Sequence, residues 1–382
     1  MKPLSRTVSP SITMSLDREA RELIASGRDV INLTAGQVDL PMPEAGKAAV
    51  RLALDENRTG YIPATGSADI KEAVRNRMGW TEGEILISAG AKPLLSAAAA
   101  CLCGPGDDVL LPAPCYTSYP EMIRLAGANP ICVFGDPENR FTVSRTALEQ
   151  AATNRTKAIL FNNPVNPTGT VYAKDELAEI VDFCKTQDLY LIADEVYGTF
   201  VYDAPFVSLY DFPDARERLI LVNSASKSFA MAGLRLGWAV APEPVASAIA
   251  GYLSHAVGCP CSLSERAAKA VLEGDEAPSL SLRDVFRKRR GTLFSLLKDI
   301  PGIRTERSDG AFYLWADVRG IEPDDTAFCR ALLSAEGVAL APGSAFLLPG
   351  YVRIAYTQPE PVLAEAAARL KRFAAQYGKH AG

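Results

Sequence analysis

Short apolar runs alternate with helical stretches through the middle of the chain, and this alternation limits the possible folds more than any other feature. The helical stretches include AKPLLSAAAACLC and AKDELAEIVDFCKTQ. The runs with the length and composition of strands are EILISAG, DVLLPAP, NPICVFG, KAILFNNP, LYLIADE, LILVNSAS and RLGWAVAP. Because parallel strands need long, usually helical, crossover connections, the pattern predicts an α/β fold with a mostly parallel sheet between two layers of helices.

The two ends of the chain are predicted to form a smaller α/β domain beside this large one. In residues 15–27 the apolar side chains recur at the spacing of a helix, and a glycine ends the segment. A long charged helix is predicted around residues 281–300, and we expect it to connect the two domains. With 382 residues, the chain is long enough for more than one core. We predict an N-terminal arm over residues 1–13, a small domain over residues 14–45 and 286–382, and a large domain over residues 46–285.

Composition argues against several classes of function. The 40 basic and 45 acidic residues give a formal net charge of -5, which disfavours a nucleic-acid partner. Only 2 histidines are present, which argues against a histidine-rich metal site or a serine–histidine–aspartate triad. The N-terminus lacks the apolar core of a signal peptide, and the alanine-rich run at residues 94–103 is too short to span a bilayer. We therefore expect a cytoplasmic protein, with its cysteines as buried free thiols because none has C-x-x-C spacing.

Candidate chemistry lies where the predicted strands end. In open α/β sheets, ligands bind beyond the carboxyl ends of the strands. KAILF runs into the polar segment NNPVNPTG, and LYLIA runs into Asp194 and Tyr197. LILVNSA leads to Ser226 and Lys227, and DVLLPAP leads to Tyr116. We expect these side chains to meet at one edge of the sheet.

Three residues near these ends indicate one kind of cofactor chemistry. Taken singly, Asp194 fits a helix cap, and Lys227 and Arg235 fit solvated surface groups. A fixed, partly buried anion at Asp194 would keep a pyridine nitrogen protonated and so make the ring an electron sink. A lysine beside an apolar strand end loses its proton more easily and can attack an aldehyde. Arg235, with Gly233 and Gly237 beside it, allows bidentate binding of a phosphate.

In this order, the segments resemble the class I and II aminotransferases of fold type I, which depend on pyridoxal phosphate. SASKSFAMAGLRLGW is similar to that family's lysine signature, NNPVNPTG to its N-P-T-G segment and ADEVYGTFVYD to its D-E-x-Y segment. GYIPATGS, SAGAK, APCYTSYPEM, GAFY, APGSAF and YVRIAYT also fall in the family's order. The opening segment PSITMSLDREARELIASGRDVINLTAGQ is most like the prokaryotic aspartate aminotransferase branch. The resemblance covers nearly the whole chain.

The resemblance implies roles for the residues that would bind the cofactor. Lys227 would hold pyridoxal phosphate as a Schiff base and shuttle a proton, and Asp194 would pair with the pyridine nitrogen. Tyr197 and Asn166 would make hydrogen bonds to the phenolic oxygen, and Tyr116 would stack on the ring. The phosphate would be bound by Ala91, Lys92, Ser224 and Arg235, by Ser226 unless it only caps a helix, and by Tyr61 reaching across from the neighbouring subunit.

The resemblance also implies how substrates bind. Arg353 would hold the α-carboxylate as a fork, which lysine could not do equally well. Asn166 would reach the same carboxylate, Gly36 would let substrate pass close to the backbone, and Lys92 would read the side-chain carboxylate of acidic substrates. The implied reaction is a ping-pong transfer of an amino group from an amino acid to a 2-oxo acid, with 2-oxoglutarate as acceptor, in a homodimer.

Departures from the family pattern near the pocket leave the amino donor open. Pro93 stands where the branch usually has glutamine, GQVDL replaces the usual G-E-P-D-F, and Cys115 lies beside Tyr116. An aspartate-like donor and a specialised amino acid both remain candidates, and a pyridoxal-phosphate-dependent lyase or cyclase is the alternative. A ligand sensor is disfavoured because the chain is not basic, and a nicotinamide dehydrogenase because no strand is followed by G-x-G-x-x-G.

Overall fold

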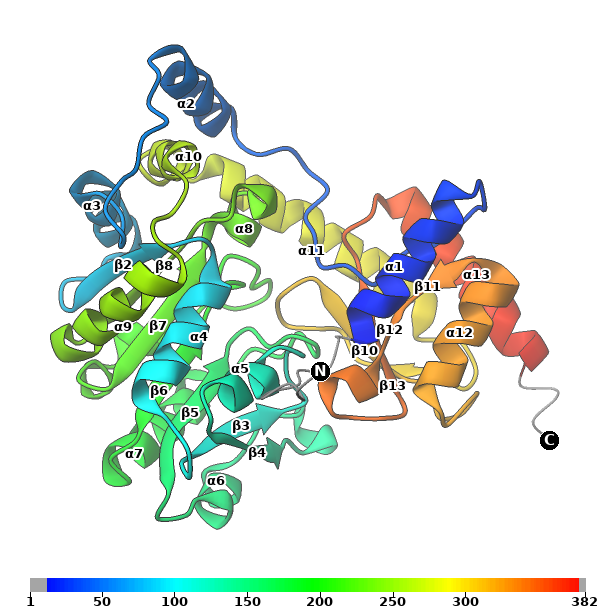
Figure 1. Ribbon diagram of the computed structural model, residues 1–382. Helices are drawn as coiled ribbons and strands as arrows, with labels where there is room; N and C mark the ends of the chain where they lie inside the picture. Colours follow the sequence, from blue (N-terminus) through cyan, green and yellow to red (C-terminus); the bar gives the residue numbers. More distant parts are fainter. Residues whose placement is uncertain (1–11, 378–382) are drawn as a thin grey trace, which may run out of the picture.

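The computed structural model describes residues 12–377, and its largest element is a seven-stranded sheet (Figure 1). The strands lie in the order β2-β8-β7-β6-β5-β3-β4, and all are parallel except β8. The members are β2 (Glu84–Ser88), β3 (Asp108–Ala113), β4 (Asn129–Phe134), β5 (Thr156–Asn162), β6 (Tyr190–Asp194), β7 (Leu219–Ser224) and β8 (Gly237–Ala241). Each predicted apolar run forms a strand, so the prediction of a mostly parallel sheet is confirmed.

Helices cover both faces of this sheet because consecutive strand residues point to opposite sides. In β5, Leu160 lies in one apolar core, whereas Ile159 and Phe161 lie in the other. The first core is covered by α4 (Ala91–Leu102), α5 (Tyr119–Leu125) and α9 (Glu243–Ala256). The second is covered by α3 (Ala68–Met78), α6 (Arg145–Ala151), α7 (Lys174–Thr186) and α10 (Ser262–Leu272).

Strand β8 is antiparallel to β7 because the connection between them is a short turn and not a crossover. β7 leads directly into the one-turn helix α8 (Ala225–Ser228), and the 3₁₀ turn η4 (Ala232–Leu234) follows before β8 begins. This turn carries Lys227 and Arg235 to the carboxyl end of β7. The local reversal of the chain therefore positions the two residues of the predicted lysine signature.

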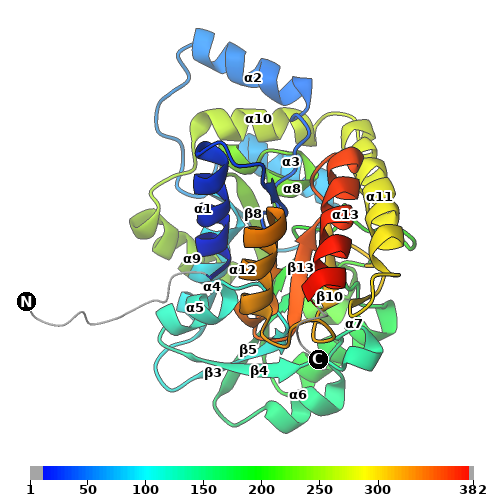
Figure 2. The same cartoon turned by 90° about the vertical axis from the view of Figure 1, so that its right-hand side faces the viewer.

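The two ends of the chain meet in a second group of elements. A four-stranded antiparallel sheet has the order β12-β13-β10-β9, and β1 pairs in parallel with β11. Figure 2 looks onto α1, α12 and α13, whose apolar residues share one core with this sheet and with α11. The elements are α1 (Ile12–Ala25), β1 (Ile31–Asn32), α11 (Ala277–Leu297), β9 (Arg304–Thr305), β10 (Tyr313–Asp317), α12 (Asp325–Glu336), β11 (Val338–Ala339), β12 (Ala341–Pro342), β13 (Tyr351–Ala355) and α13 (Glu360–Tyr377).

Helix α2 (Glu44–Asp55) stands apart from both sheets and packs against α10 (Figure 1). Leu52 and Leu54 on this helix are 57% and 50% exposed. Tyr61, which follows α2, is fully exposed. This region therefore presents apolar side chains that the described chain does not cover by itself.

The predicted domain boundaries are not decided by this arrangement. Of the predicted N-terminal arm, residues 1–11 lie outside the described residues, and α1 already begins at Ile12. The predicted boundary after residue 285 falls inside α11, which is one continuous helix. Within residues 12–377, no helix is long and apolar enough to cross a membrane.

The cysteines are free thiols, as expected, but not all of them are buried. Cys103, Cys115, Cys184 and Cys329 are buried, whereas Cys261 is exposed. The expectation of a buried thiol is therefore wrong for Cys261, which caps the exposed start of α10, and it holds only in part for Cys101, Cys132 and Cys259, which are partly buried.

Candidate active site

A cavity of about 320 Å³ lies between the carboxyl ends of β6 and β7 and the second sheet. Asp194 reaches it from the end of β6, Ser224 from the end of β7, and Arg353 from β13. The predicted site residues that line it are Gly36, Ala91, Lys92, Tyr116, Asn166, Asp194, Tyr197, Ser224, Ser226, Lys227, Arg235 and Arg353. The fold thus brings together in one cavity every predicted site residue except Tyr61.

Lys227 lies in α8, and its side chain is partly buried in the cavity. Its Nζ donates a hydrogen bond to the carbonyl oxygen of Gly36 at 2.5 Å and lies 5.6 Å from the ring centroid of Phe312. Loss of water, together with the nearby charges of Arg353 and Arg235, lowers the pKa of Lys227 to about 8, and Asp194 opposes the shift. About a tenth of this amine is therefore neutral at pH 7, far more than of an ordinary lysine, and the neutral form is the one that attacks an aldehyde or takes up a proton.

Asp194 is a buried carboxylate at the end of β6. Its Oδ2 accepts a hydrogen bond from Tyr119 Oη at 2.9 Å, and its Oδ1 accepts one from the Val196 amide at 3.2 Å. Burial raises its pKa to about 6, although both hydrogen bonds oppose the shift. Among the described residues, no cationic side chain forms a salt bridge with it. A buried acid without a cationic partner is suited to a ligand that brings a positive charge.

The planar guanidinium of Arg353 reaches the cavity from β13 and is held in place by its neighbours. Its Nη1 donates to Asn166 Oδ1 at 2.8 Å, and its Nη2 donates to the Thr34 carbonyl oxygen at 2.5 Å. Its guanidinium carbon lies 4.3 Å from the ring centroid of Tyr313 and 4.7 Å from that of Phe346. The guanidinium is thus fixed in one plane before any substrate arrives, and its Nε has no hydrogen-bond partner in the described chain. This geometry suits a planar carboxylate.

The start of α4 forms a cradle for an anion together with Arg235. The first residues of this helix, Ala91 and Lys92, line the cavity, and helix N-termini attract anions. Arg235 donates to the carbonyl oxygens of Ala232 at 3.0 Å and of Ala89 at 3.4 Å. A Cβ at Gly237 would lie 2.6 Å from the Ala91 amide nitrogen, so only glycine allows this close approach. A phosphate fits these donors.

Two tyrosines that line the cavity, Tyr197 and Tyr313, contact each other. The hydroxyl groups of Tyr197 and Tyr313 are 2.9 Å apart, and burial raises the pKa of Tyr197 well above its usual value. A Cβ at Gly36 would lie 1.8 Å from Tyr313 Oη, which explains why a glycine stands where the loop after β1 passes the cavity. The pair keeps a protonated hydroxyl available to a ligand oxygen.

Sequence reasoning missed several residues of this site. Tyr119, Tyr313, Thr34 and Asp17 all line the cavity. Tyr119 and Tyr313 stand inside the segments APCYTSYPEM and GAFY, so their motifs pointed to them. Asp17 and Thr34 also stand inside a quoted segment, PSITMSLDREARELIASGRDVINLTAGQ, but nothing in that segment marked them as site residues.

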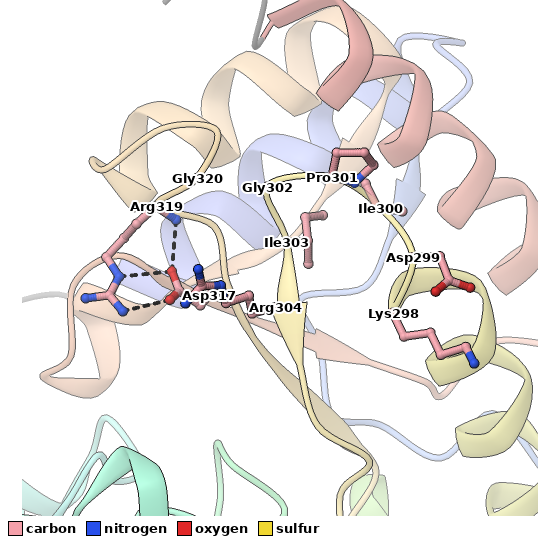
Figure 3. Close-up of a pocket in the computed structure, with 10 residues that line it drawn as sticks. All are labelled: Lys298, Asp299, Ile300, Pro301, Gly302, Ile303, Arg304, Asp317, Arg319 and Gly320. Atoms are coloured by element: carbon pink, nitrogen blue, oxygen red, sulfur yellow. Dashed lines mark hydrogen bonds and ion pairs between the residues drawn. The ribbon is translucent and has the colours of Figure 1, made fainter.

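A larger hollow of about 660 Å³ lies elsewhere, on the second group of elements (Figure 3). It is lined by residues 298–304, Asp317, Arg319 and Gly320. Its main charged contact is a closed pair in which Arg319 Nη2 lies 2.7 Å from Asp317 Oδ2. No predicted site residue lies in it, and the smaller cavity is therefore the candidate active site.

Comparison with known proteins agrees with this geometry. Residues 28–370 match the family described as "Aminotransferase class I and II". An aspartate/prephenate aminotransferase from Cereibacter sphaeroides is 35% identical, with 96% of this chain and 97% of the relative aligned. The aspartate aminotransferase from Bacillus subtilis is 34% identical, with 96% of each chain aligned. The solved structure of aspartate aminotransferase from Thermus thermophilus with maleate has a TM-score of 0.94 and 34% identity, covering 97% of this chain and 100% of that one.

The chain belongs to the class I and II aminotransferases, a family of pyridoxal-phosphate-dependent enzymes that transfer amino groups. Within that family, it falls in the aspartate aminotransferase branch of fold type I. These relatives do not favour the lyase or cyclase alternative.

Proposed function

We propose that this cavity binds pyridoxal phosphate and exchanges an amino group between an α-amino acid and a 2-oxo acid, with Lys227 as the proton carrier. The observation that carries the proposal is the placement of Lys227 Nζ in one cavity with a buried, unpaired Asp194 and a preformed Arg353 fork. Family membership supports the same chemistry.

The residues of the cavity fit each part of the cofactor. Ala91, Ser224 and Arg235 would hold the phosphate, Asp194 would face the protonated ring nitrogen, and Tyr116 would lie against the ring. Ser226 would assist at the phosphate, and Tyr197 and Asn166 would hold the phenolic oxygen. Pyridoxal phosphate, when bound, supplies an aldehyde that condenses with amines and a ring that accepts electrons from Cα.

Lys227 would move the proton that the transfer requires. With its pKa lowered to about 8, Nζ can take a proton from the substrate Cα and deliver it to the cofactor carbon that keeps the amino group, without a large energetic cost in either direction. Asp194 would keep a negative charge beside the ring nitrogen of the cofactor. Arg353 would orient the α-carboxylate, so that the Cα proton faces Lys227.

Both substrates of a ping-pong transfer would occupy this cavity in turn. Arg353 and Asn166 would bind the carboxylate that the two share, and Gly36 would let it approach the backbone. Lys92, whose Nζ lies 5.4 Å from the ring centroid of Tyr116, would attract the second carboxylate of an acidic partner such as 2-oxoglutarate. The maleate of the Thermus thermophilus relative, also a dicarboxylate, supports this assignment.

The proposed enzyme is a homodimer with two domains in each subunit. We propose a small domain at residues 14–45 and 286–382, which contains the four-stranded sheet and the β1–β11 pair, and a large domain at residues 46–285 around the seven-stranded sheet. Full exposure of Tyr61 and the apolar side chains of α2 support an interface there. Tyr61 would reach the phosphate of the neighbouring subunit.

Replacing the proposed proton carrier tests this function. We expect Lys227→Ala to lower kcat by about a thousandfold or more in an assay that pairs amino donors with 2-oxoglutarate, because the carrier and the covalent anchor are both lost. Lys174→Ala, an exposed lysine in α7, serves as the matched control and should keep full activity.

The wild-type enzyme must also stop after one turnover when no oxo acid is present. We expect stoichiometric release of oxo acid from an added amino acid, measured by rapid quench. Continued turnover without an acceptor, or full activity of Lys227→Ala, would contradict the proposed function.

A further inference from the structure

Tyr313 is a buried residue of the cavity that contacts two groups of the proposed machinery. It lies at the start of β10 and is 2% exposed. The guanidinium carbon of Arg353 is 4.3 Å from its ring centroid, and its hydroxyl lies 2.9 Å from that of Tyr197. One side chain therefore contacts both the group assigned to the substrate α-carboxylate and a group assigned to the cofactor.

The pairing of β10 with β13 fixes the contact between Tyr313 and Arg353. In this antiparallel ladder Trp315 lies opposite Arg353, and Tyr313 lies opposite Ala355. Tyr313 and Arg353 are thus diagonal neighbours on one face of the sheet, within reach of long side chains. A cation is attracted to an aromatic face most strongly where water is excluded, and Arg353 is only 5% exposed. The ring of Tyr313, together with that of Phe346 at 4.7 Å, therefore holds the guanidinium in one orientation.

The hydroxyl of Tyr313 decides where Tyr197 can donate its own proton. A hydroxyl has one proton, so when Tyr197 donates to a cofactor oxygen, its contact with Tyr313 must use the proton of Tyr313. Burial raises the pKa of Tyr313, although Arg353 and Tyr197 oppose the shift, so this proton is present at neutral pH. A hydroxyl that accepts one hydrogen bond donates a stronger one. Tyr313 therefore orients Tyr197 and strengthens its hydrogen bond to the phenolic oxygen.

The loop after β1 limits the movement of this hydroxyl. A Cβ at Gly36 would lie 1.8 Å from Tyr313 Oη, so the backbone packs directly on the hydroxyl. The carbonyl oxygen of the same glycine accepts the hydrogen bond from Lys227 Nζ. This packing leaves the Tyr313 hydroxyl little room to move away from Tyr197.

We propose that Tyr313 is a positioning residue with two separable roles: its ring holds Arg353 for the α-carboxylate, and its hydroxyl directs Tyr197 at the phenolic oxygen of the cofactor. The inference rests on the proposed aminotransfer at this cavity. The two roles predict different effects, because the ring acts on substrate binding and the hydroxyl acts on the bound cofactor.

Two substitutions separate the hydroxyl from the ring. Tyr313→Phe removes only the hydroxyl, and we expect kcat to fall about tenfold while KM for the amino donor stays within about twofold of wild type. Because Tyr197 then stabilises the negative phenolic oxygen less well, the cofactor-loaded enzyme should lose its proton at a higher pH. The midpoint of its absorbance change with pH should rise by about half a unit. Tyr313→Leu also removes the aromatic face, so KM and the dissociation constant of maleate should rise about tenfold as well.

Tyr172→Phe is the matched control. The Tyr172 hydroxyl is buried outside the cavity and accepts a hydrogen bond from the Val143 amide at 3.0 Å. Its loss should reduce stability but leave kcat, KM and the absorbance midpoint unchanged.

Each role of Tyr313 can be overturned separately. An unchanged kcat or an unchanged midpoint in Tyr313→Phe overturns the role of the hydroxyl. Equal maleate affinity in Tyr313→Leu and Tyr313→Phe overturns the role of the ring. Failure of the wild-type enzyme to bind pyridoxal phosphate or to transfer an amino group would instead contradict the proposed function, so the failures are distinguishable.

Discussion

At the scale of single residues, burial shifts the two central ionisable groups in opposite directions. It lowers the pKa of Lys227 to about 8 and raises that of Asp194 to about 6. Both shifts favour the neutral form, because a charged group loses hydration in the cavity. Groups poised in this way near neutral pH can exchange protons with a ligand at small cost.

The cost of burying Asp194 predicts a stability change in the cofactor-free protein. Its folded pKa of about 6 exceeds the ordinary value of 3.8, so its contribution to stability is largest below pH 3.8 and is lost as the pH rises through 6. We expect Asp194→Asn to raise the free energy of unfolding at pH 7 by about 2–3 kcal/mol. The same substitution should weaken binding of pyridoxal phosphate.

Denaturant unfolding of both cofactor-free proteins at pH 4 and pH 7 checks this prediction. The stability difference should be present at pH 7 and nearly absent at pH 4. An equal difference at both pH values would show that burial of the charge is not the cause.

At the scale of elements, the turn from β7 to β8 and the start of α4 form one unit. The turn carries Lys227 and Arg235, and β8 begins with Gly237 against the first turn of α4. Antiparallel pairing of β8 with both β2 and β7 brings these segments together. The phosphate cradle therefore depends on backbone packing as well as on charged side chains.

Filling the space at Gly237 should damage this unit. In Gly237→Ala, the added Cβ would meet the Ala91 nitrogen and the Gly90 carbonyl carbon at 2.6 Å, and backbone cannot yield as a flexible side chain does. We expect a loss of about 1–3 kcal/mol of stability and a weaker affinity for pyridoxal phosphate.

Gly251→Ala is the matched control for this change. Gly251 lies in α9, and a Cβ there would meet nothing within 4 Å. Alanine at this helix position should stabilise the protein slightly. Thermal unfolding measures the stability of both variants, and a titration monitored by absorbance measures their affinity for the cofactor. Equal cofactor affinity in the two variants would contradict the role of this backbone packing in phosphate binding.

At the scale of the whole molecule, the site exists because the two ends of the chain fold onto the middle. Gly36 and Arg353 come from segments more than three hundred residues apart, and both face Lys227. Arg289 of α11 stabilises this meeting: it binds Asp39 through two contacts at 2.7 and 2.9 Å and the Thr357 carbonyl oxygen at 2.9 Å. These contacts hold the loop after β1 beside the end of β13.

The proposed homodimer predicts that subunits complement one another. If Tyr61 serves the neighbouring site, Tyr61→Ala and Lys227→Ala subunits form a mixed dimer with one intact site. Random mixing at equal amounts should restore about a quarter of wild-type activity. Each variant alone should remain well below that level. Activity after coexpression or subunit exchange measures the effect, and no gain on mixing would place Tyr61 within its own subunit or outside the site.

Much of this protein was predictable from local patterns in the sequence. The seven apolar runs predicted the strands of the large sheet, because burial on both faces requires continuous apolar residues. The ordered segments around Lys227, Asp194 and Arg353 identified the family, because each chemical role needs a particular residue type. The exposure of Cys261 escaped prediction, because the burial of a residue at an element end depends on neighbours distant in sequence.

Only the tertiary structure decided which remaining residues join the site. Tyr119 contacts Asp194 because its side chain reaches from the start of α5 to the end of β6, and Tyr313 of β10 contacts Tyr197, which follows β6. Asp17 enters the cavity through the packing of α1 against the second sheet. Such contacts depend on long-range packing, which no local pattern encodes. The sequence by itself determined the fold and the chemical class, and the packing of the two ends of the chain determined which further side chains line the cavity.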